Sequence, residues 1–131
     1  MNSRAALTNP IFVAVDVDTA EDALKLVRGT RAFVGGFKVG PRLSLRYGET
    51  LLKEIARHGN MFVDSKFFDI PSTMESAVRA AFECGASFAT VHAQAGKEAL
   101  SLLAELEEEL CKVRPFRILA VTILTSFRQD T

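Results

Sequence analysis

The sequence predicts an α/β fold, with a parallel sheet of about five strands and four helices outside it. Two observations predict this class. Strand-like and helix-like segments alternate from residue 11 onward, and the strand-like segments are nearly continuous apolar runs. Such runs are typical of parallel strands that are buried on both faces, and the alternation is typical of βα units. With 131 residues, the chain has room for one domain with a sizeable core.

The first strand and the first helix follow an N-terminal arm. Residues 1–10 lack the apolar stretch of a secretory signal, so we expect a flexible arm there. IFVAVD (11–16) is an apolar run that ends in an acid, which predicts a buried strand. Asp18 or Thr19 can cap the following helix, and Gly29 is expected to end it.

The second strand and helix lie between two glycine-containing turns. FVGGFKVG (33–40) predicts a strand and a turn, and residues 41–58 predict a helix that Gly59 ends. Five apolar residues are expected on the buried side of this helix. They are Leu43, Leu45, Leu51, Leu52 and Ile55.

The rest of the chain repeats the same pattern. MFVDSKF (61–67), SFATVHA (87–93) and RILAVTILT (117–125) predict the last three strands. An Ala-rich helix is expected near 72–84, and leucines at helical spacing predict a long amphipathic helix over 97–113.

The composition argues against several kinds of partner. Sixteen Lys and Arg residues balance sixteen Asp and Glu residues, so neither nucleic acid nor an anionic membrane is indicated. No apolar run approaches the roughly 20 residues that a membrane-spanning helix needs. Cys84 and Cys111 are too far apart to suggest a metal pair, and we expect two reduced core thiols in a cytoplasmic protein.

Polar residues gather where the predicted strands end. Those at or near the C-terminal ends are Asp16, Lys38, Asp64, Lys66, His92 and Thr125. Active sites form at this rim in (βα)8 barrels and also in open, doubly wound sheets. The rim therefore predicts a site, while the spacing of the elements leaves both architectures open.

Asp64 and Lys66 are the strongest candidates for chemistry. They are two residues apart on a strand, so their side chains are expected on the same face. Buried charges need compensation, which Asp16 and Lys38 can supply from neighbouring strand ends. The cluster is either a preorganised electrostatic site or an ion-pair network that holds the strand ends together. Because buried ion pairs contribute little stability by themselves, we favour the site.

Other polar residues have a structural explanation as well as a functional one. Asp69 can form the turn before Pro71, and Thr73 can cap the third helix. His92 at a strand end is typical of a hydrogen-bonded core histidine, and Ser126 is typical of a turn.

The segment DSKFFDIP (64–71) resembles a known signature. Orotidine 5′-phosphate decarboxylases carry Asp-x-Lys-x-x-Asp-Ile-Pro at the end of their third strand. Four further matches stand around it in the family's order. They are Asp16 in VAVD, Lys38 in FKVG, His92 in TVHA and Ser126 in VTILTS. The resemblance covers the chain from residue 11 onward and implies a partial (βα)8 TIM barrel.

The resemblance also implies roles for the charged residues. Lys66 would protonate C6 of the pyrimidine as carbon dioxide leaves, and its ammonium would stabilise the developing charge. Asp64 would lie against the substrate carboxylate and disfavour the ground state. Lys38 would hold this pair and contact the ribose, and Asp16 would bind a ribose hydroxyl. No metal or cofactor is implied.

The remaining site residues follow from the same resemblance. Asp69 would reach across a dimer interface into the partner's site, with Ile70 and Thr73 nearby. Ser126 would contact the pyrimidine ring, and His92 would lie among the substrate-binding residues.

The resemblance covers only part of a barrel. A (βα)8 barrel takes about 250 residues, and this chain supplies five strands at most. We expect residues 11–131 to form the N-terminal portion, with the phosphate-binding strands and loops missing and little or no turnover by the chain alone. Because the first and fifth strands would be open edges, we expect a homo-oligomer or pairing with a complementing C-terminal half.

Two other functions remain open. The chain is a non-catalytic half-barrel folding module whose charged cluster is a remnant, or it is a sugar-phosphate lyase of the same suprafamily. Such lyases usually place a magnesium-binding acid where this chain has Lys38, and they lack the Ile-Pro extension. Lys38 and Pro71 therefore favour the metal-independent decarboxylase.

Overall fold

The computed structural model describes residues 9–130 as five strands and four helices in strict alternation. The strands are β1 (Phe12–Ala14), β2 (Gly36–Val39), β3 (Asn60–Phe67), β4 (Ala86–His92) and β5 (Arg117–Val121). The helices are α1 (Ala20–Thr30), α2 (Pro41–Ala56), α3 (Pro71–Glu83) and α4 (Lys97–Cys111), with a short 3₁₀ helix η2 (Ala93–Ala95).

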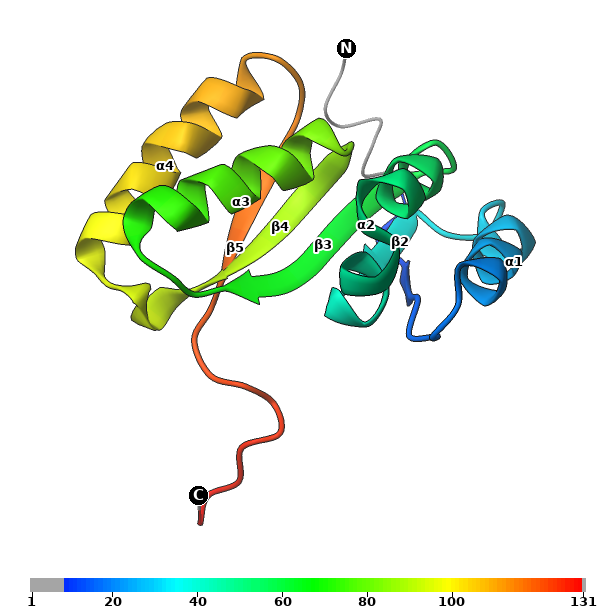
Figure 1. Ribbon diagram of the computed structural model, residues 1–131, viewed down its shortest axis with the longest axis horizontal. Coiled ribbons are helices and arrows are strands. Elements are labelled where there is room, and N and C mark those ends of the chain that lie inside the picture. Colours follow the sequence, from blue (N-terminus) through cyan, green and yellow to red (C-terminus); the bar gives the residue numbers. More distant parts are fainter. Residues whose placement is uncertain (1–8, 131) are drawn as a thin grey trace.

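The order of the strands distinguishes between the two architectures that the sequence allowed. All neighbouring strands are parallel, and they lie in the order β1-β2-β3-β4-β5. A doubly wound sheet reverses direction at a switch point, and this sheet has none. Since βα crossovers are right-handed, sequential crossovers place every helix on the same face, as Figure 1 shows. The fold is therefore a partial (βα)8 barrel, with β1 and β5 at its edges.

The core lies between the sheet and its helices. On the strands, alternate side chains point toward the helices, and Phe37, Met61, Val63 and Val91 are buried among them. The helices contribute apolar side chains at helical spacing, as the sequence predicted. The buried ones include Val27, Leu43, Ile55, Met74, Val78, Leu103, Leu106 and Leu110.

The opposite face of the sheet has no helix over it within the described residues. Its N-terminal end carries three partly buried rings, Phe12, Phe62 and Phe88, in edge-to-face contact with centroids 5.8–6.5 Å apart. Gly36 makes room for this cluster, because a Cβ there would lie 2.6 Å from the ring of Phe12. In a closed barrel, this face becomes the interior.

The helix boundaries correct two expectations. Thr19 caps α1, its hydroxyl accepting a hydrogen bond from the Asp22 amide, but the helix continues past Gly29 to Thr30. Thr73 does not cap α3, because Pro71 is the first helical residue and Ile70 takes the cap position. Proline suits the first turn since it has no amide hydrogen to leave unpaired.

One residue expected in the core is exposed. Gly48 interrupts α2 with φ 62°, a left-handed conformation that glycine adopts without a steric penalty. The helical periodicity is broken there, and Leu45 is 87% exposed while the other four predicted residues are buried. The sequence alone reads residues 41–58 as one uninterrupted helix.

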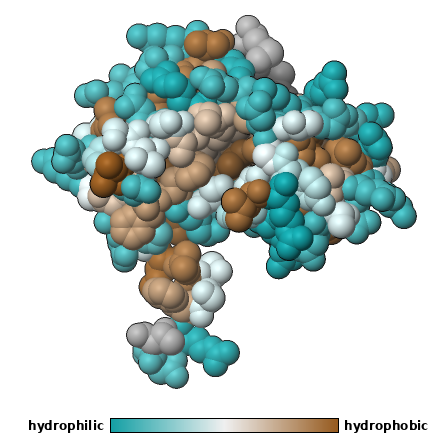
Figure 2. Space-filling view, viewed as in Figure 1, coloured by the Kyte–Doolittle hydropathy of each residue, from teal (hydrophilic) through white to brown (hydrophobic). Residues whose placement is uncertain are grey.

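The last strand is shorter than expected. Runs of apolar residues predicted a strand over 117–125, but β5 ends at Val121 and the chain continues without regular structure. This segment runs away from the sheet in Figure 1, and Figure 2 shows hydrophobic atoms over it. Ile123 and Phe127 account for two exposed apolar side chains of this segment.

The start of the described chain is tied to the sheet. The Asn9 side chain donates a hydrogen bond to the Phe33 carbonyl and accepts one from the Ile11 amide. The rest of the predicted arm, residues 1–8, lies outside the described residues. Across residues 9–130, no helix combines the length and apolar character needed to cross a membrane.

Candidate active site

The end of β3 departs from regular strand geometry. β3 and β4 pair at Val63 and Ala89, and pairing resumes at Phe67 and Val91. Three residues of β3 therefore face a single residue of β4, which is Thr90. Within this bulge, Lys66 has φ 48°, a left-handed conformation that costs a non-glycine residue on the order of 1 kcal/mol. Such strain is concentrated at functional sites and needs support from surrounding contacts.

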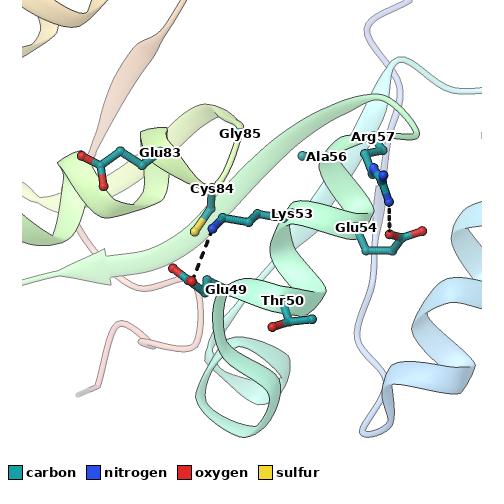
Figure 3. Close-up of a pocket in the computed structure, with 9 residues that line it drawn as sticks. All are labelled: Glu49, Thr50, Lys53, Glu54, Ala56, Arg57, Glu83, Cys84 and Gly85. Atoms are coloured by element: carbon teal, nitrogen blue, oxygen red, sulfur yellow. Dashed lines mark hydrogen bonds and ion pairs between the residues drawn. The ribbon is translucent and has the colours of Figure 1, made fainter.

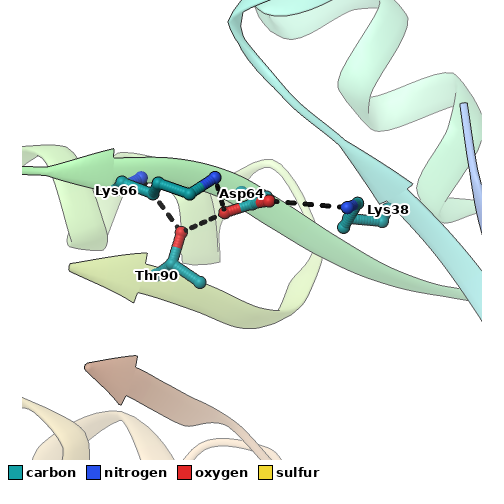
Figure 4. Close-up of polar contacts among 4 residues, drawn as sticks. All are labelled: Lys38, Asp64, Lys66 and Thr90. Carbon is teal, nitrogen blue, oxygen red and sulfur yellow. Dashed lines mark hydrogen bonds and ion pairs between the residues drawn. The ribbon is translucent and has the colours of Figure 1, made fainter. Parts of the chain in front are cut away.

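Asp64 is the centre of the charged cluster on the open face. Its Oδ1 lies 3.0 Å from Lys66 Nζ, and its Oδ2 lies 3.6 Å from Lys38 Nζ on β2. Figure 4 shows the carboxylate between the two ammonium groups. The Asp64 side chain is 14% exposed, whereas the two lysines are more than a third exposed. The two cations thus flank a largely buried anion and remain open to solvent.

The surroundings of Asp64 favour its ionised form. Burial alone would raise the pKa of this carboxyl, but hydrogen bonds from Lys66 and Thr90 and the charges of Lys66 and Lys38 outweigh it. The pKa of Asp64 is therefore below its usual value. At neutral pH the cluster therefore holds a negative charge on Asp64, at the centre of the site.

Thr90 belongs to this site, and the sequence reading missed it. Its hydroxyl lies 2.8 Å from Asp64 Oδ1 and 3.0 Å from the backbone nitrogen of Lys66. A threonine in a strand is unremarkable by itself because β-branched residues favour strands. The available signal was its place two residues before His92, on the same face as the predicted site residues.

Asp16 lies on the same face but apart from the other charges. Ala14 pairs with Lys38, and Asp16 lies two residues beyond it on β1. It is exposed, and Arg42 contacts only its backbone carbonyl, at 3.3 Å. Among the described residues, its carboxylate makes no ion pair with Lys38 or Lys66. The expected convergence thus holds for three of the four charges.

Asp69, Ile70 and Thr73 follow β3 and lie on the surface. Asp69 and Thr73 are exposed, and Ile70 is 63% exposed. Asp69 Oδ1 accepts a hydrogen bond from the Ile70 amide at 2.7 Å, as expected for a turn-forming aspartate. This segment is presented outward and does not contact the Asp64 cluster.

His92 ends β4, and Ser126 lies beyond β5. The ring of His92 stacks on Phe68 with centroids 5.1 Å apart, and its Nδ1 accepts a hydrogen bond from the Gln94 amide. The histidine thereby connects the ends of β3 and β4 beside the cluster. Ser126 is exposed in the irregular segment after β5, and the described structure gives it no contact with the cluster.

A cavity of about 590 Å³ lies elsewhere, between the C-terminal ends of α2 and α3. Cys84 and two ion pairs line this cavity. Figure 3 shows the pairs, which are Lys53 with Glu49 and Arg57 with Glu54. Because helices run antiparallel to the strands, this cavity lies at the N-terminal end of the sheet. That end of a barrel contributes to stability, and catalysis takes place at the other end.

The comparisons with known proteins agree with this geometry. Residues 9–131 match the profile of the orotidine 5'-phosphate decarboxylase / HUMPS family. A curated relative from Rhodospirillum rubrum, named orotidine 5'-phosphate decarboxylase, is 37% identical over 127 residues, covering 93% of this chain and 51% of its own length. A relative of the same name from Aliivibrio salmonicida is 38% identical over 121 residues, covering 92% and 51%. The chain therefore spans about half the length of these relatives.

Solved structures give the same result. The orotidine 5'-phosphate decarboxylase of Lactobacillus acidophilus superposes with a TM-score of 0.80 at 30% identity, covering 93% of this chain and 56% of that one. The orotidine 5'-monophosphate decarboxylase of Methanocaldococcus jannaschii, solved with the inhibitor BMP, gives a TM-score of 0.76 at 27% identity. It covers 86% of this chain and 51% of that one.

Proposed function

The chain belongs to the orotidine 5'-phosphate decarboxylase / HUMPS family, and we propose from this that it carries the catalytic cluster for metal-independent decarboxylation of orotidine 5'-monophosphate to uridine 5'-monophosphate in pyrimidine biosynthesis. One observation carries the proposal. A largely buried, ionised Asp64 lies between the ammonium groups of Lys66 and Lys38, on the sheet face that a barrel encloses. The two relatives described above carry the name of this activity.

The cluster suits the cleavage of a carbon–carbon bond next to a carboxylate. A substrate carboxylate placed beside Asp64 is repelled, which raises the energy of the ground state. When the bond between C6 and the carboxylate breaks, its electron pair stays on C6, so the negative charge moves to C6 and the carboxylate group leaves as neutral carbon dioxide. The ammonium of Lys66 stabilises that carbanion and then transfers a proton to C6. The uncharged Lys66 amine regains its proton from solvent.

The other predicted residues surround this centre in the proposal. Lys38 holds Asp64 and contacts the ribose. Asp16, which lies on the same face of the sheet two residues beyond the β1 partner of Lys38, binds a ribose hydroxyl. Ser126 contacts the pyrimidine ring, and His92 is among the substrate-binding residues. The reaction needs no metal and no cofactor.

In the same proposal, the exposed segment after β3 contacts a second protomer. Asp69 reaches into the site of a second protomer, with Ile70 and Thr73 beside it. Its support is the outward presentation of these residues, including the 63% exposure of Ile70, an apolar side chain. The proposal also assigns the protein to the cytoplasm, where Cys84 and Cys111 remain reduced thiols.

Turnover by this chain alone is expected to be weak or absent. Phosphate sites of barrels typically lie in the loops after strands seven and eight, and the described structure has five strands. Binding energy from such remote groups is used to lower the barrier at the reacting carbon. Joining this chain to the C-terminal half of a curated relative should therefore supply the missing binding energy.

The direct test is an assay of this joined form, called the completed protein below. Orotidine 5'-monophosphate is incubated with the chain alone and with the completed protein, and loss of the substrate's ultraviolet absorbance is followed. We expect turnover by the completed protein and little by the chain alone. A folded completed protein that neither decarboxylates the nucleotide nor binds its product would favour the alternative of a non-catalytic folding module. Magnesium-dependent turnover of a sugar phosphate would instead identify the lyase of the suprafamily.

The open edges of the sheet support a homo-oligomer or a complementing half as partner. β1 and β5 each have one unpaired side among the described elements, and the face between them carries half-buried aromatic rings. Edges of this kind promote association. Light scattering of the chain at micromolar concentration should give a mass above that of one chain, and a uniform monomer would contradict this expectation.

A further inference from the structure

The hydroxyl of Thr90 has both of its hydrogen-bond roles fixed. A backbone amide can only donate, so the Lys66 N–H donates to Thr90 Oγ1 at 3.0 Å. The Thr90 hydrogen is then free for Asp64 Oδ1 at 2.8 Å, and an ionised carboxylate can only accept. The hydroxyl thus joins the acid and the base of the charged cluster through one oxygen, as Figure 4 shows.

Thr90 also occupies the position where the sheet ladder is interrupted. The bulge in β3 leaves Asp64, Ser65 and Lys66 between two regular pairings with β4. Thr90 lies opposite them, and its side chain accepts the Lys66 amide that the irregular ladder would leave unpaired. A satisfied amide stabilises the left-handed conformation of Lys66, with φ 48°. This conformation keeps the Lys66 side chain on the same face as Asp64.

The burial of Thr90 shows that this hydroxyl is committed to the site. Thr90 is 3% exposed, and it is the one polar residue in the buried set of the described chain. Water has little access to replace its hydrogen bonds, so their removal leaves the Lys66 amide without this acceptor and leaves Asp64 Oδ1 with the Lys66 ammonium but without the hydroxyl donor. Position 90 therefore requires a hydroxyl for a reason other than strand propensity.

We infer that Thr90 is a positioning residue for decarboxylation, whose hydroxyl holds the Asp64 carboxylate and the Lys66 backbone in the geometry that proton transfer to carbon requires. This inference rests on the proposed function. Thr90 does not touch the reacting atoms in it and acts through Asp64 and Lys66. It follows that position 90, two residues before His92, needs a side chain with a hydroxyl or another group that can both donate and accept a hydrogen bond.

The test compares side chains of similar shape at position 90 in the completed protein. Thr90→Val removes the hydroxyl and keeps the branched shape, whereas Thr90→Ser keeps the hydroxyl and loses a methyl group. We expect Thr90→Val to lower kcat by roughly 10- to 100-fold, with a smaller change in KM. Thr90→Ser should restore kcat to within a few-fold of the parent. The matched control is Ser87→Ala, because Ser87 also carries a β4 hydroxyl that bonds to β3, through Asn60 at 3.0 Å, away from the cluster.

A second readout separates positioning from general stability. Titration of the Asp64 carboxylate by carbon NMR reports its pKa directly, without any turnover. Thr90→Val should raise that pKa, because the carboxylate loses a hydrogen bond to its ionised form, and Thr90→Ser should not. If Thr90→Val does not fold, Thr90→Cys replaces it, since a thiol is a weak donor, and the same direction of change is expected.

The outcomes distinguish this inference from the proposed function. An active completed protein in which Thr90→Val changes neither kcat nor the Asp64 titration would overturn the inference and leave the function standing. A completed protein with no activity in any form, but with a shifted Asp64 titration in Thr90→Val, would overturn the function and support the placement of Asp64 by Thr90. A loss of kcat in Thr90→Ser as large as in Thr90→Val would show that shape, not the hydroxyl, matters.

Discussion

Met61 and Asp64 lie three residues apart on β3, yet they belong to opposite faces of the sheet. Met61 points toward the helices and is fully buried among apolar side chains. Asp64 points to the open face, where two ammonium groups and a hydroxyl surround it. The difference teaches that one strand can supply stability on one side and chemistry on the other, because its side chains alternate. Changes on the two faces should therefore have separable consequences.

The largest effect is expected from Lys66→Ala in the completed protein. It removes the proton donor, so decarboxylation should fall by roughly 10²- to 10⁴-fold or more while product binding largely persists. The measurements are single-turnover decarboxylation and calorimetric binding of uridine 5'-monophosphate. The free energy of unfolding should also fall, because Asp64 loses its nearest cation and alanine keeps the Cβ that makes φ 48° unfavourable. Near-normal turnover would show that another group protonates the carbon.

The second prediction concerns stability and compares neighbours on the two faces. Met61→Ala creates a cavity in the helix-covered core and should lower the free energy of unfolding by about 3 kcal/mol. Phe62→Ala removes a larger side chain, but one that is only partly buried on the open face, so its effect should be smaller by about 1 kcal/mol or more. Urea denaturation of the chain measures both.

The same two substitutions also test the difference between the two faces when the open face is covered. In the completed protein, the two destabilisations should approach each other, because the C-terminal half buries Phe62. An equal effect of the two changes in the chain alone would mean that this face is already covered, for example by a second copy.

The third prediction uses the lowered pKa of Asp64. A carboxyl whose folded pKa is depressed contributes stability above its unfolded pKa, and that contribution is lost as the pH falls through the folded pKa. The window therefore begins near the ordinary value of 3.8 and extends below it. Asp64→Asn removes this titration, so its stability should depend less on pH in this range than that of the parent chain. Fluorescence-detected or circular-dichroism unfolding between neutral and acid pH compares the two chains, and parallel curves would contradict the electrostatic role of Asp64.

The smallest effect is expected at Cys84. Burial is the main reason that the pKa of its thiol is raised, and the neighbouring Glu49 adds to it. The thiol should react slowly with a maleimide at neutral pH in the folded chain and quickly after denaturation. Cys84→Ser should change stability by only about 1 kcal/mol and leave decarboxylation by the completed protein unchanged. A loss of activity in this variant would connect the cavity between α2 and α3 to the site.

Much of this fold follows from sequence patterns, and the exceptions have local causes. Continuous apolar runs located all five strands, and the polar residues at their ends located Lys38, Asp64 and Lys66 on one rim. The predicted burial of Leu45 was wrong, because a pattern of helical spacing does not reveal that Gly48 interrupts the helix with a left-handed conformation. The predicted range of the fifth strand was too long, because an apolar run does not reveal whether a neighbouring strand is present to pair with it. Thr90 was missed because its importance depends on a bulge in a different strand.

The uninterrupted strand order has a consequence for how the molecule assembles. Each strand pairs with the one that precedes it in the chain, so each new pairing closes a loop of only one βα unit. Short loop closures favour rapid folding, and a chain leaving the ribosome can add such units one at a time. Lys38, Asp64 and Thr90 come from three consecutive strands. The charged cluster is thus complete as soon as β4 docks on β3, before any later part of the polypeptide is needed.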